Sequence, residues 1–316
     1  MKRPVRREVL RDRLDALVAT FDVSTITPDP LELVLRYSDP RDQEVAGLIA
    51  AAFAYGRADI IVANIGAVLD RMQPSPFAYL ADFNRERAFA DFAGFAHRFH
   101  KTPDLVDLLA RIASAIAEHG SLGELFRRCY DERDEDIGPS LTRFVEALLT
   151  CHPERSEGPG RAGGAKNFGS RTTHPSRSLP FANAQGRDDR GLRYLLTSPK
   201  DGSACKRMNL FLRWMVRRTP PDLGIWDFVD PAKLVVPLDT HVHRIATFLG
   251  ISDRKTPDWK AARAITDRFA KFDRADPVRY DFAVCRLGIL DLCSRKRRKE
   301  NCDVCLLRDV CRFPVV

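Results

Sequence analysis

The chain has 316 residues, of which 44% are hydrophobic, and this is enough apolar material for a buried core and, by length, for about two domains. Fibrous, collagen-like and wholly disordered proteins are therefore excluded, and with no run near the roughly 18 apolar residues of a membrane span we expect a cytoplasmic protein. Lysine and arginine outnumber aspartate and glutamate by 51 to 43, and a basic excess in 286–316 indicates a polyanionic partner.

Apolar residues recur at helical spacing along most of the chain, which predicts an all-α protein. Expected helices start with the aspartate–proline pair at Asp39 and continue through 61–72, 105–116, 141–148 and 282–292. The segment 233–237 is the best strand candidate, although it is too short to build a sheet. Ten of the forty residues in 151–190 are glycine or proline, so we expect a disordered insertion there, with helix resuming at Gly191.

Four of the eight cysteines lie close together near the C-terminus, namely Cys293, Cys302, Cys305 and Cys311. A reducing compartment keeps such thiols free, and four soft thiolates in one short segment suit a tetrahedral metal or an iron–sulfur cluster. Zinc is the alternative to a cluster. Zinc modules usually present two close pairs, however, and only Cys302 and Cys305 form one here.

Five consecutive basic residues lie between the first two of these cysteines: Arg295, Lys296, Arg297, Arg298 and Lys299. A basic loop anchored at both ends by metal ligands suits contacts to the phosphates of a nucleic acid, which require charge and fixed placement but no sequence reading. The alternative is an ordinary solvated run of charge.

Two further segments carry candidate functional residues. Asp239, in Pro-Leu-Asp-Thr-His, precedes an amphipathic helix, where an aspartate is most often an N-cap. Lys200 and Gly202 belong to a turn that precedes an apolar helix beginning near Lys206, and such a turn can direct backbone N–H groups at a phosphate. The sequence alone does not choose between a structural and a functional role for these residues.

The cysteine spacing and the Leu-Asp-Thr-His segment resemble the helix-hairpin-helix DNA glycosylases of the endonuclease III type, although the first cysteine gap there is usually six residues rather than eight. The resemblance implies an all-α, two-lobed fold, a C-terminal 4Fe-4S cluster rather than zinc, and double-stranded DNA with a flipped base as the partner of a monomeric protein. It assigns the catalytic carboxylate to Asp239, which would stabilise the positive charge that develops on the deoxyribose.

The resemblance is weaker at the hairpin. Members with lyase activity carry a lysine two residues after the second hairpin glycine, a position that corresponds to Ala204 here. Either the register slips and Lys206 supplies the amine, or the chain lacks the lyase nucleophile. Tyr55 and Arg57 follow a predicted helix, where the family places a residue that wedges into DNA; the alternative is a helix end with a core tyrosine.

We therefore expect an N-terminal helix (1–38) that packs on the C-terminal lobe, a helical barrel lobe (39–246) and a C-terminal lobe (247–316) with the cysteines. As a whole the chain more closely resembles an uncharacterised bacterial family, recognisable by Ala-Tyr-Gly-Arg, Ser-Pro-Lys-Asp-Gly-Ser-Ala-Cys-Lys-Arg and Pro-Leu-Asp-Thr-His. The predicted function is a base-excision DNA glycosylase, with lyase activity if Lys206 supplies the amine. The alternative is a nucleic-acid-binding protein with an iron–sulfur or zinc module and no catalysis.

Overall fold

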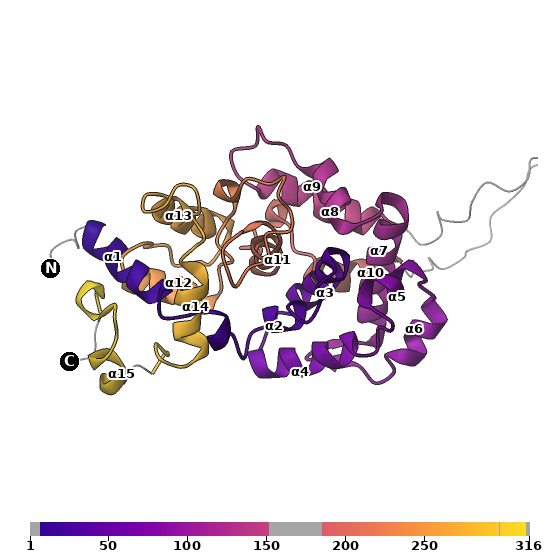
Figure 1. The fold of residues 1–316 in the computed structure, drawn as a ribbon, viewed down its shortest axis with the longest axis horizontal. Coiled ribbons are helices and arrows are strands. Elements are labelled where there is room, and N and C mark those ends of the chain that lie inside the picture. The colour runs from indigo at the N-terminus through magenta and orange to yellow at the C-terminus, as the bar shows by residue number, and fades with distance from the viewer. Residues whose placement is uncertain (1–6, 152–184, 297, 314–316) are drawn as a thin grey trace, which may run out of the picture.

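The computed structural model describes residues 7–151, 185–296 and 298–313, and the regular structure in these residues is mostly helical, which confirms the all-α prediction. Figure 1 shows an elongated molecule in which the first and last helices lie together at one end. The helices between α3 and α10 form the other end, with α11 near the centre. The chain therefore returns to its starting point, and both of its ends contribute to the same group of helices.

The first half of the chain supplies α1 and then the helices of the far end. Their bounds are α1 (Arg7–Val18), α2 (Leu31–Val34), α3 (Pro40–Ala52), α4 (Ala58–Leu69), α5 (Pro76–Ala81), α6 (Arg85–Asp91), α7 (Thr102–His119), α8 (Leu122–Cys129), α9 (Gly138–Thr150) and α10 (Gln185–Leu195). A 3-10 helix, η1 (Val23–Thr25), follows α1. The strands β1 (Ala96–His97) and β2 (His100–Lys101) form a short antiparallel hairpin before α7.

The second half runs from the centre back to the end that holds α1. Its helices are α11 (Lys206–Val216), α12 (Thr240–Phe248), α13 (Trp259–Ala270), α14 (Asp281–Ile289) and α15 (Lys299–Asp303), with the 3-10 helices η3 (Pro199–Asp201), η4 (Pro231–Lys233) and η5 (Arg308–Val310). Helix α1 packs against α14 and η5, and an ion pair between Arg13 and Asp309 joins the two ends of the chain. Helices α12 and α14 pack against each other, as do α3 and α11.

Side-chain caps explain why many helices begin where they do. Asp39 accepts a hydrogen bond from the backbone N–H of Arg41, with Pro40 in the first turn of α3. Asp258 caps α13 in the same way, through the N–H of Ala261. These side chains satisfy N–H groups that have no partner inside the helix, so the polar residue before each apolar run sets the helix start.

A buried ionic network joins α11 to α14 through the core. The guanidinium of Arg213 is ion-paired with Asp222 and Asp281, and all three side chains are at most 3% exposed. A buried charge pair gains little net stability over an apolar pair, but removing one partner leaves an uncompensated charge that costs several kcal/mol. The network therefore fixes α14 relative to α11, and this placement matters for the cavity described below.

Two local predictions are wrong, and one short hairpin is not predicted by the sequence. Residues 233–237 are not a strand, because Lys233 ends η4 and the chain then runs irregularly to α12. The strands are β1 and β2, which are too short to show alternation in the sequence. The expected insertion at 151–190 lies mostly outside the described residues, but α10 begins at Gln185 rather than at Gly191. The sequence does not reveal this start, because residues 185–190 contain no apolar residue that would mark a helical face. The buried contacts of α10 come from Leu192 and Leu195.

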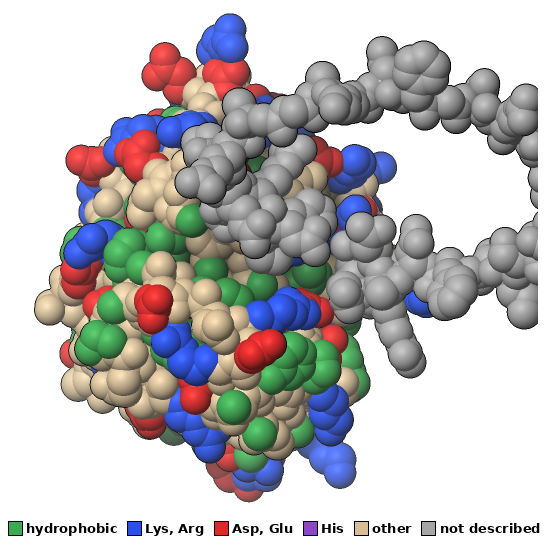
Figure 2. Space-filling model, turned by 90° about the vertical axis from the view of Figure 1, so that its right-hand side faces the viewer, with side chains coloured by type: hydrophobic (Ala, Val, Ile, Leu, Met, Phe, Trp, Pro, Cys, Tyr) green, Lys and Arg blue, Asp and Glu red, His purple; other side chains and the backbone are tan. Residues whose placement is uncertain are grey.

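None of the helices in the described ranges combines the length and the apolar character that a membrane crossing requires. Figure 2 views the molecule from the end opposite to α1, where lysine and arginine side chains are interspersed with aspartate and glutamate. The visible part of this face therefore does not gather the basic excess of the chain into one patch.

Candidate functional site

A cavity of about 520 Å³ lies where the first turns of α11 and α12 meet α14, and its volume falls in the range of small-ligand pockets. Lys206, the first residue of α11, and Asp239, the N-cap of α12, both line it. The remaining walls come from the segments around Pro28 and Arg57 and from one face of α14. The structure thus brings together the two residues for which the sequence suggests a catalytic role.

Asp239 both caps α12 and faces the cavity. Its Oδ1 atom accepts hydrogen bonds from the backbone N–H groups of His241 and Val242, each at 2.8 Å. Its Oδ2 atom lies 3.5 Å from the Sγ of Cys285 on α14. One oxygen is therefore committed to the helix, while the other is directed toward the cavity wall, so the capping and the functional interpretation of this aspartate are compatible.

Lys206 is held by the end of α3. Its Nζ atom donates a hydrogen bond to the carbonyl oxygen of Ala54 at 2.9 Å. Burial raises the pKa of the carboxyl of Asp29 and of the thiol of Cys285, and the positive charge of Lys206 opposes this rise in both groups. The amine therefore stands among acidic groups, with a fixed position relative to the backbone.

The cavity contains acidic groups that the sequence analysis did not single out. Burial raises the pKa of Asp281 to about 7, and the charge of Asp239 adds to this, while Arg213 opposes it. Burial also raises the pKa of Asp29 and, well above its usual value, that of Cys285. An aspartate among the apolar residues of α14 was the available signal in the sequence, since a buried acid is rare unless it is paired or functional.

His241 lines the same cavity, and burial lowers the pKa of its ring. A Cβ atom on Gly288 would collide with this ring, so only glycine lets α14 approach α12 so closely here. His243 points elsewhere, with Nε2 at 2.9 Å from the carbonyl oxygen of Arg254. The two histidines therefore diverge along the helix, as their spacing of two residues requires.

Arg57 lies at the edge of the cavity, whereas Tyr55, two residues earlier in the chain, is not among the residues that line it. Arg57 lines it, is exposed and is ion-paired with Asp59 at 2.6 Å. Tyr55 is half-buried, and its hydroxyl is hydrogen-bonded to His100 and to the carbonyl oxygen of His97. The exposed ring at this place is instead Phe99, at the tip of the β1–β2 hairpin, which is 58% exposed and stacks on Tyr55 with centroids 5.7 Å apart.

Lys200 and Gly202 occupy the turn between α10 and α11, a helix–turn–helix arrangement in the place where the sequence suggests a hairpin. Gly202 adopts a left-handed conformation (φ 71°), which favours glycine, and its carbonyl accepts a hydrogen bond from the N–H of Trp259. The Nζ of Lys200 is ion-paired with Glu146 at 2.8 Å, and both side chains are exposed. The turn is therefore tied to α9 and to α13.

The four C-terminal cysteines surround a second, smaller cavity of about 40 Å³. Its other walls are largely apolar and come from α12, α14 and the C-terminal turns, including Ile245, Phe248 and Leu287. No three of the four described cysteine sulfurs lie within 4.8 Å of one another. All four thiols line this cavity and are candidate ligands for a metal ion or an iron–sulfur cluster.

The basic residues between Cys293 and Cys302 lie on the surface next to this cavity. Arg295, Lys296, Arg298 and Lys299 are exposed, whereas Arg297 lies outside the described residues. Arg298 lines the cavity of the cysteines and lies 3.9 Å from Asp291. These side chains face solvent, and the carboxylate of Asp291 offsets part of their charge.

One pair of helices serves both cavities. Helix α12 begins at the larger cavity with Asp239 and ends at the smaller one with Phe248, and α14 runs from Asp281 toward Cys293. Arg244 on α12 donates to the carbonyl oxygen of Cys293 and lies 3.3 Å from the ring of His241. The cysteine loop therefore supports the helices that carry the acidic groups.

These features describe a helical protein with a lysine and several carboxyl groups in one cavity, next to a four-cysteine loop. The chain belongs to a family described as a protein of unknown function (DUF2400), whose model matches residues 29–290. Lys206, Asp239 and Asp281 fall inside the matched region, and the four cysteines follow it. Neither the curated proteins nor the solved structures contain a match to the chain.

Proposed function

We propose that the protein is a DNA N-glycosylase that binds double-stranded DNA as a cytoplasmic monomer and removes a flipped, damaged base. The observation that carries this proposal is the convergence of Lys206 and Asp239 on one cavity of about 520 Å³. Enzymes that act on a base inside a duplex must rotate it out of the stack into such a pocket. A carboxylate beside the pocket is then available to stabilise the charge that develops on the sugar.

In the proposed reaction the bond between the base and C1′ of the deoxyribose breaks, and the base leaves with the bonding electrons and takes up a proton. Asp239 stabilises the positive charge on the sugar and positions the nucleophile, which is water or the amine of Lys206. Attack by Lys206 would form a C–N bond at C1′ and lead to lyase chemistry. Asp281, whose pKa is raised to about 7, retains part of its proton near neutral pH and is a second group for proton handling.

Three surface features support a nucleic-acid partner. Arg57 lines the cavity and is exposed, Phe99 is exposed at the tip of the β1–β2 hairpin and stacks on Tyr55, and the described basic residues 295, 296, 298 and 299 are exposed next to the cysteine cavity. Cationic side chains hold phosphates, and an exposed aromatic ring is suited to stacking on an unpaired base. We propose that Arg57, Lys200, Gly202 and the basic run bind the backbone and that Phe99, stacked on Tyr55, occupies the gap left by the flipped base.

We further propose that Cys293, Cys302, Cys305 and Cys311 hold a 4Fe-4S cluster. The donor set fits, since four thiolates are the usual ligands of such a cluster, and the apolar walls shield it from water. The alternative is zinc, but zinc modules usually present two close cysteine pairs, and only Cys302 and Cys305 form one here. Its role here would be to fix the loop that carries the basic residues and to support α12 and α14.

A second candidate function is nucleic-acid binding without catalysis. It is favoured by Ala204, which occupies the position of the lyase lysine in the hairpin, and by the hydrogen bond that engages the amine of Lys206 with Ala54. In this alternative the cavity has no catalytic role, and the basic surface alone binds the nucleic acid.

The two functions are separated by a panel of duplexes that each carry one damaged base or an abasic site, incubated with the wild type, with Asp239→Asn and with Lys206→Met. Asp258→Asn is the matched control, because Asp258 also caps a helix but lies outside the cavity. We expect the wild type and Asp258→Asn to cleave at least one duplex and Asp239→Asn to lose cleavage while still binding DNA. Borohydride trapping of a covalent adduct with the wild type but not with Lys206→Met would identify the amine.

Cleavage that is unchanged in Asp239→Asn would refute the catalytic assignment. Binding without cleavage by every variant, together with a steep decrease of affinity as salt rises, would favour the non-catalytic function. Failure of every form to bind any duplex at low salt would overturn both candidates.

A further inference from the structure

A group of three side chains with atoms of the kind that ligate metals lies at the corner where α7 and α9 end, and none of the three lines either cavity. It consists of Glu118 and His119 in the last turn of α7 and of Cys151, which follows the last residue of α9. Among the described residues these three form the group whose ligand atoms all lie within 4.8 Å of one another. The four C-terminal cysteines take no part in it.

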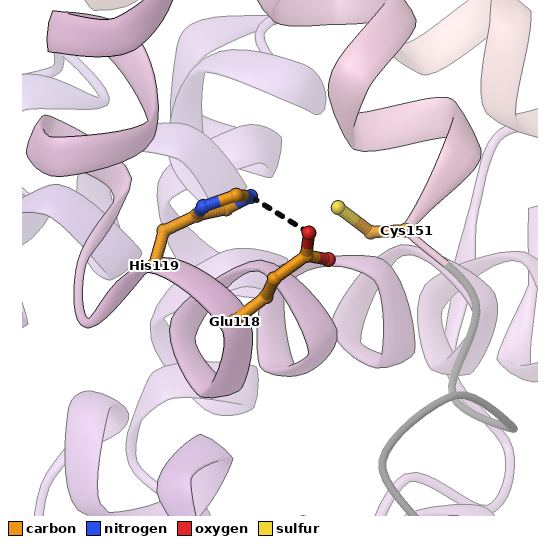
Figure 3. A group of neighbouring side chains, drawn as sticks. All are labelled: Glu118, His119 and Cys151. Atoms are coloured by element: carbon orange, nitrogen blue, oxygen red, sulfur yellow. Dashed lines mark ion pairs between the residues drawn. The ribbon is translucent and has the colours of Figure 1, made fainter.

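Figure 3 shows that the three side chains are directed toward one another. The Nε2 atom of His119 lies 3.7 Å from Oε1 of Glu118, and the sulfur of Cys151 lies on the other side of the same carboxylate. Cys151 is 6% exposed, the His119 side chain is 11% exposed and the Glu118 side chain is 64% exposed. One side of the group is therefore enclosed, and the other is open to water and to an ion.

An unpaired polar atom gives independent support. The Nδ1 atom of His119 is buried and has no hydrogen-bond partner within the described part of the chain. A buried ring nitrogen without a partner costs about 1–3 kcal/mol relative to a satisfied one. Coordination through Nδ1 would remove that cost, whereas coordination through Nε2, the atom that faces Glu118, would leave the N–H of Nδ1 to donate to a water.

The backbone also favours a cation at this corner. Helices α7 and α9 both end here, and the carboxyl end of a helix carries a partial negative charge. The guanidinium of Arg111 donates to the carbonyl oxygen of Cys151 at 2.8 Å and so fixes the residue that would supply the thiolate. Cys151, the one ligand that α7 does not supply, is therefore held in place before any ion binds.

We propose that Glu118, His119 and Cys151 bind one divalent cation of the zinc class, with water as the fourth ligand. A thiolate, an imidazole and a carboxylate are all accepted by zinc, and the two anionic ligands neutralise the charge of the ion. The thiol loses its proton to the solvent as the metal–sulfur bond forms. The ion would join the end of α7 to the end of α9, the two helices against which α10 packs. This proposed site is independent of the proposed glycosylase function.

The test uses the full-length protein as purified, with whatever metal the four C-terminal cysteines hold left in place. The wild type, Cys151→Ser, His119→Gln and Glu118→Gln are equilibrated with micromolar zinc and desalted, and both zinc and iron are measured by elemental analysis. Cys129→Ser is the matched control, because Cys129 is also a buried thiol at a helix end nearby but lies outside the group. We expect Cys151→Ser and His119→Gln to lose one zinc per chain and Glu118→Gln to bind zinc at least tenfold more weakly.

The control should keep the full zinc content, and the iron content should be the same in all five proteins, which separates this site from the C-terminal cysteines. Zinc should also raise the thermal midpoint of the wild type and of Cys129→Ser but not that of Cys151→Ser. Equal zinc in Cys151→Ser and the wild type would overturn the proposal, as would an equal loss in Cys129→Ser. If Cys151→Ser fails to fold, the exposed Glu118→Gln gives the deciding measurement, and unchanged zinc affinity in that variant refutes the site.

Discussion

Asp239 has two roles that a pair of substitutions can separate. Its Oδ1 atom accepts from two backbone N–H groups at 2.8 Å, so Asp239→Ala leaves both without a side-chain acceptor. Loss of a cap costs about 0.5–2 kcal/mol, and loss of the negative charge at the helix start adds about 0.3–1 kcal/mol. Asparagine keeps an oxygen at the cap and loses only the charge. We therefore expect unfolding free energy to fall by about 1–2 kcal/mol in Asp239→Ala and by about 0.5 kcal/mol in Asp239→Asn.

Urea unfolding at constant slope measures these differences, and each kcal/mol corresponds to roughly 2–4 °C in the thermal midpoint of a domain of this size. Asp258→Ala and Asp258→Asn serve as controls, because Asp258 accepts from the N–H of Ala261 at 2.7 Å and should show the same ranking in stability. DNA cleavage should be lost in both Asp239 variants and kept in both Asp258 variants. An Asp239→Asn protein that is destabilised as strongly as Asp239→Ala would refute the separation of the cap from the charge.

Three further predictions concern a buried carboxyl group, a close helix contact and the cysteine loop. Burial raises the pKa of Asp281 to about 7, so the folded protein holds a proton that the unfolded chain releases; the stability this gives is present below about pH 4 and is lost as the pH rises to 7. The unfolding free energy of the wild type should fall over that window by up to about 1.4 kcal/mol per pH unit relative to Asp281→Asn, and parallel pH profiles would contradict this. In Gly123→Ala the new Cβ would collide with Glu44 and lie 2.9 Å from Nε1 of Trp226, so urea unfolding should show a loss of about 2–3 kcal/mol, and a midpoint equal to that of the wild type would argue against this packing. Cys305→Ser should abolish the absorption near 400 nm and the iron of the anaerobically purified protein, whereas Cys129→Ser should keep both.

The sequence predicts most of the helices because their determinants are local. Apolar residues at helical spacing mark α7 and α9, and an aspartate before proline marks the start of α3. The cap at Asp239 is local in the same sense, since it depends on residues two and three positions away. The sequence does not predict the start of α10, because the first turn of this helix has no apolar residue. Its helical state depends instead on packing against α7 and α9.

The composition of the cavity is a tertiary property, which no short window of sequence reveals. Asp29 and Asp281 are far apart in the chain but line the same cavity, and the ion pair between Arg213 and Asp281 holds α14 to α11. The position of Tyr55 shows the same limit. Its sequence context is compatible with an exposed wedge, but the β1–β2 hairpin, which has no signature in the sequence, encloses it and leaves Phe99 exposed in its place.

Helix α12 connects the cysteine loop to the larger cavity. The helix is only nine residues long, and its two ends lie at the two cavities, so a rigid support at one end determines the position of the other. Arg244 strengthens this relation, because the same guanidinium contacts the carbonyl oxygen of Cys293 and the ring of His241. A group held by the four cysteines, as proposed above, would therefore help to place Asp239 without facing the larger cavity, which is the arrangement expected of a structural rather than a reactive centre.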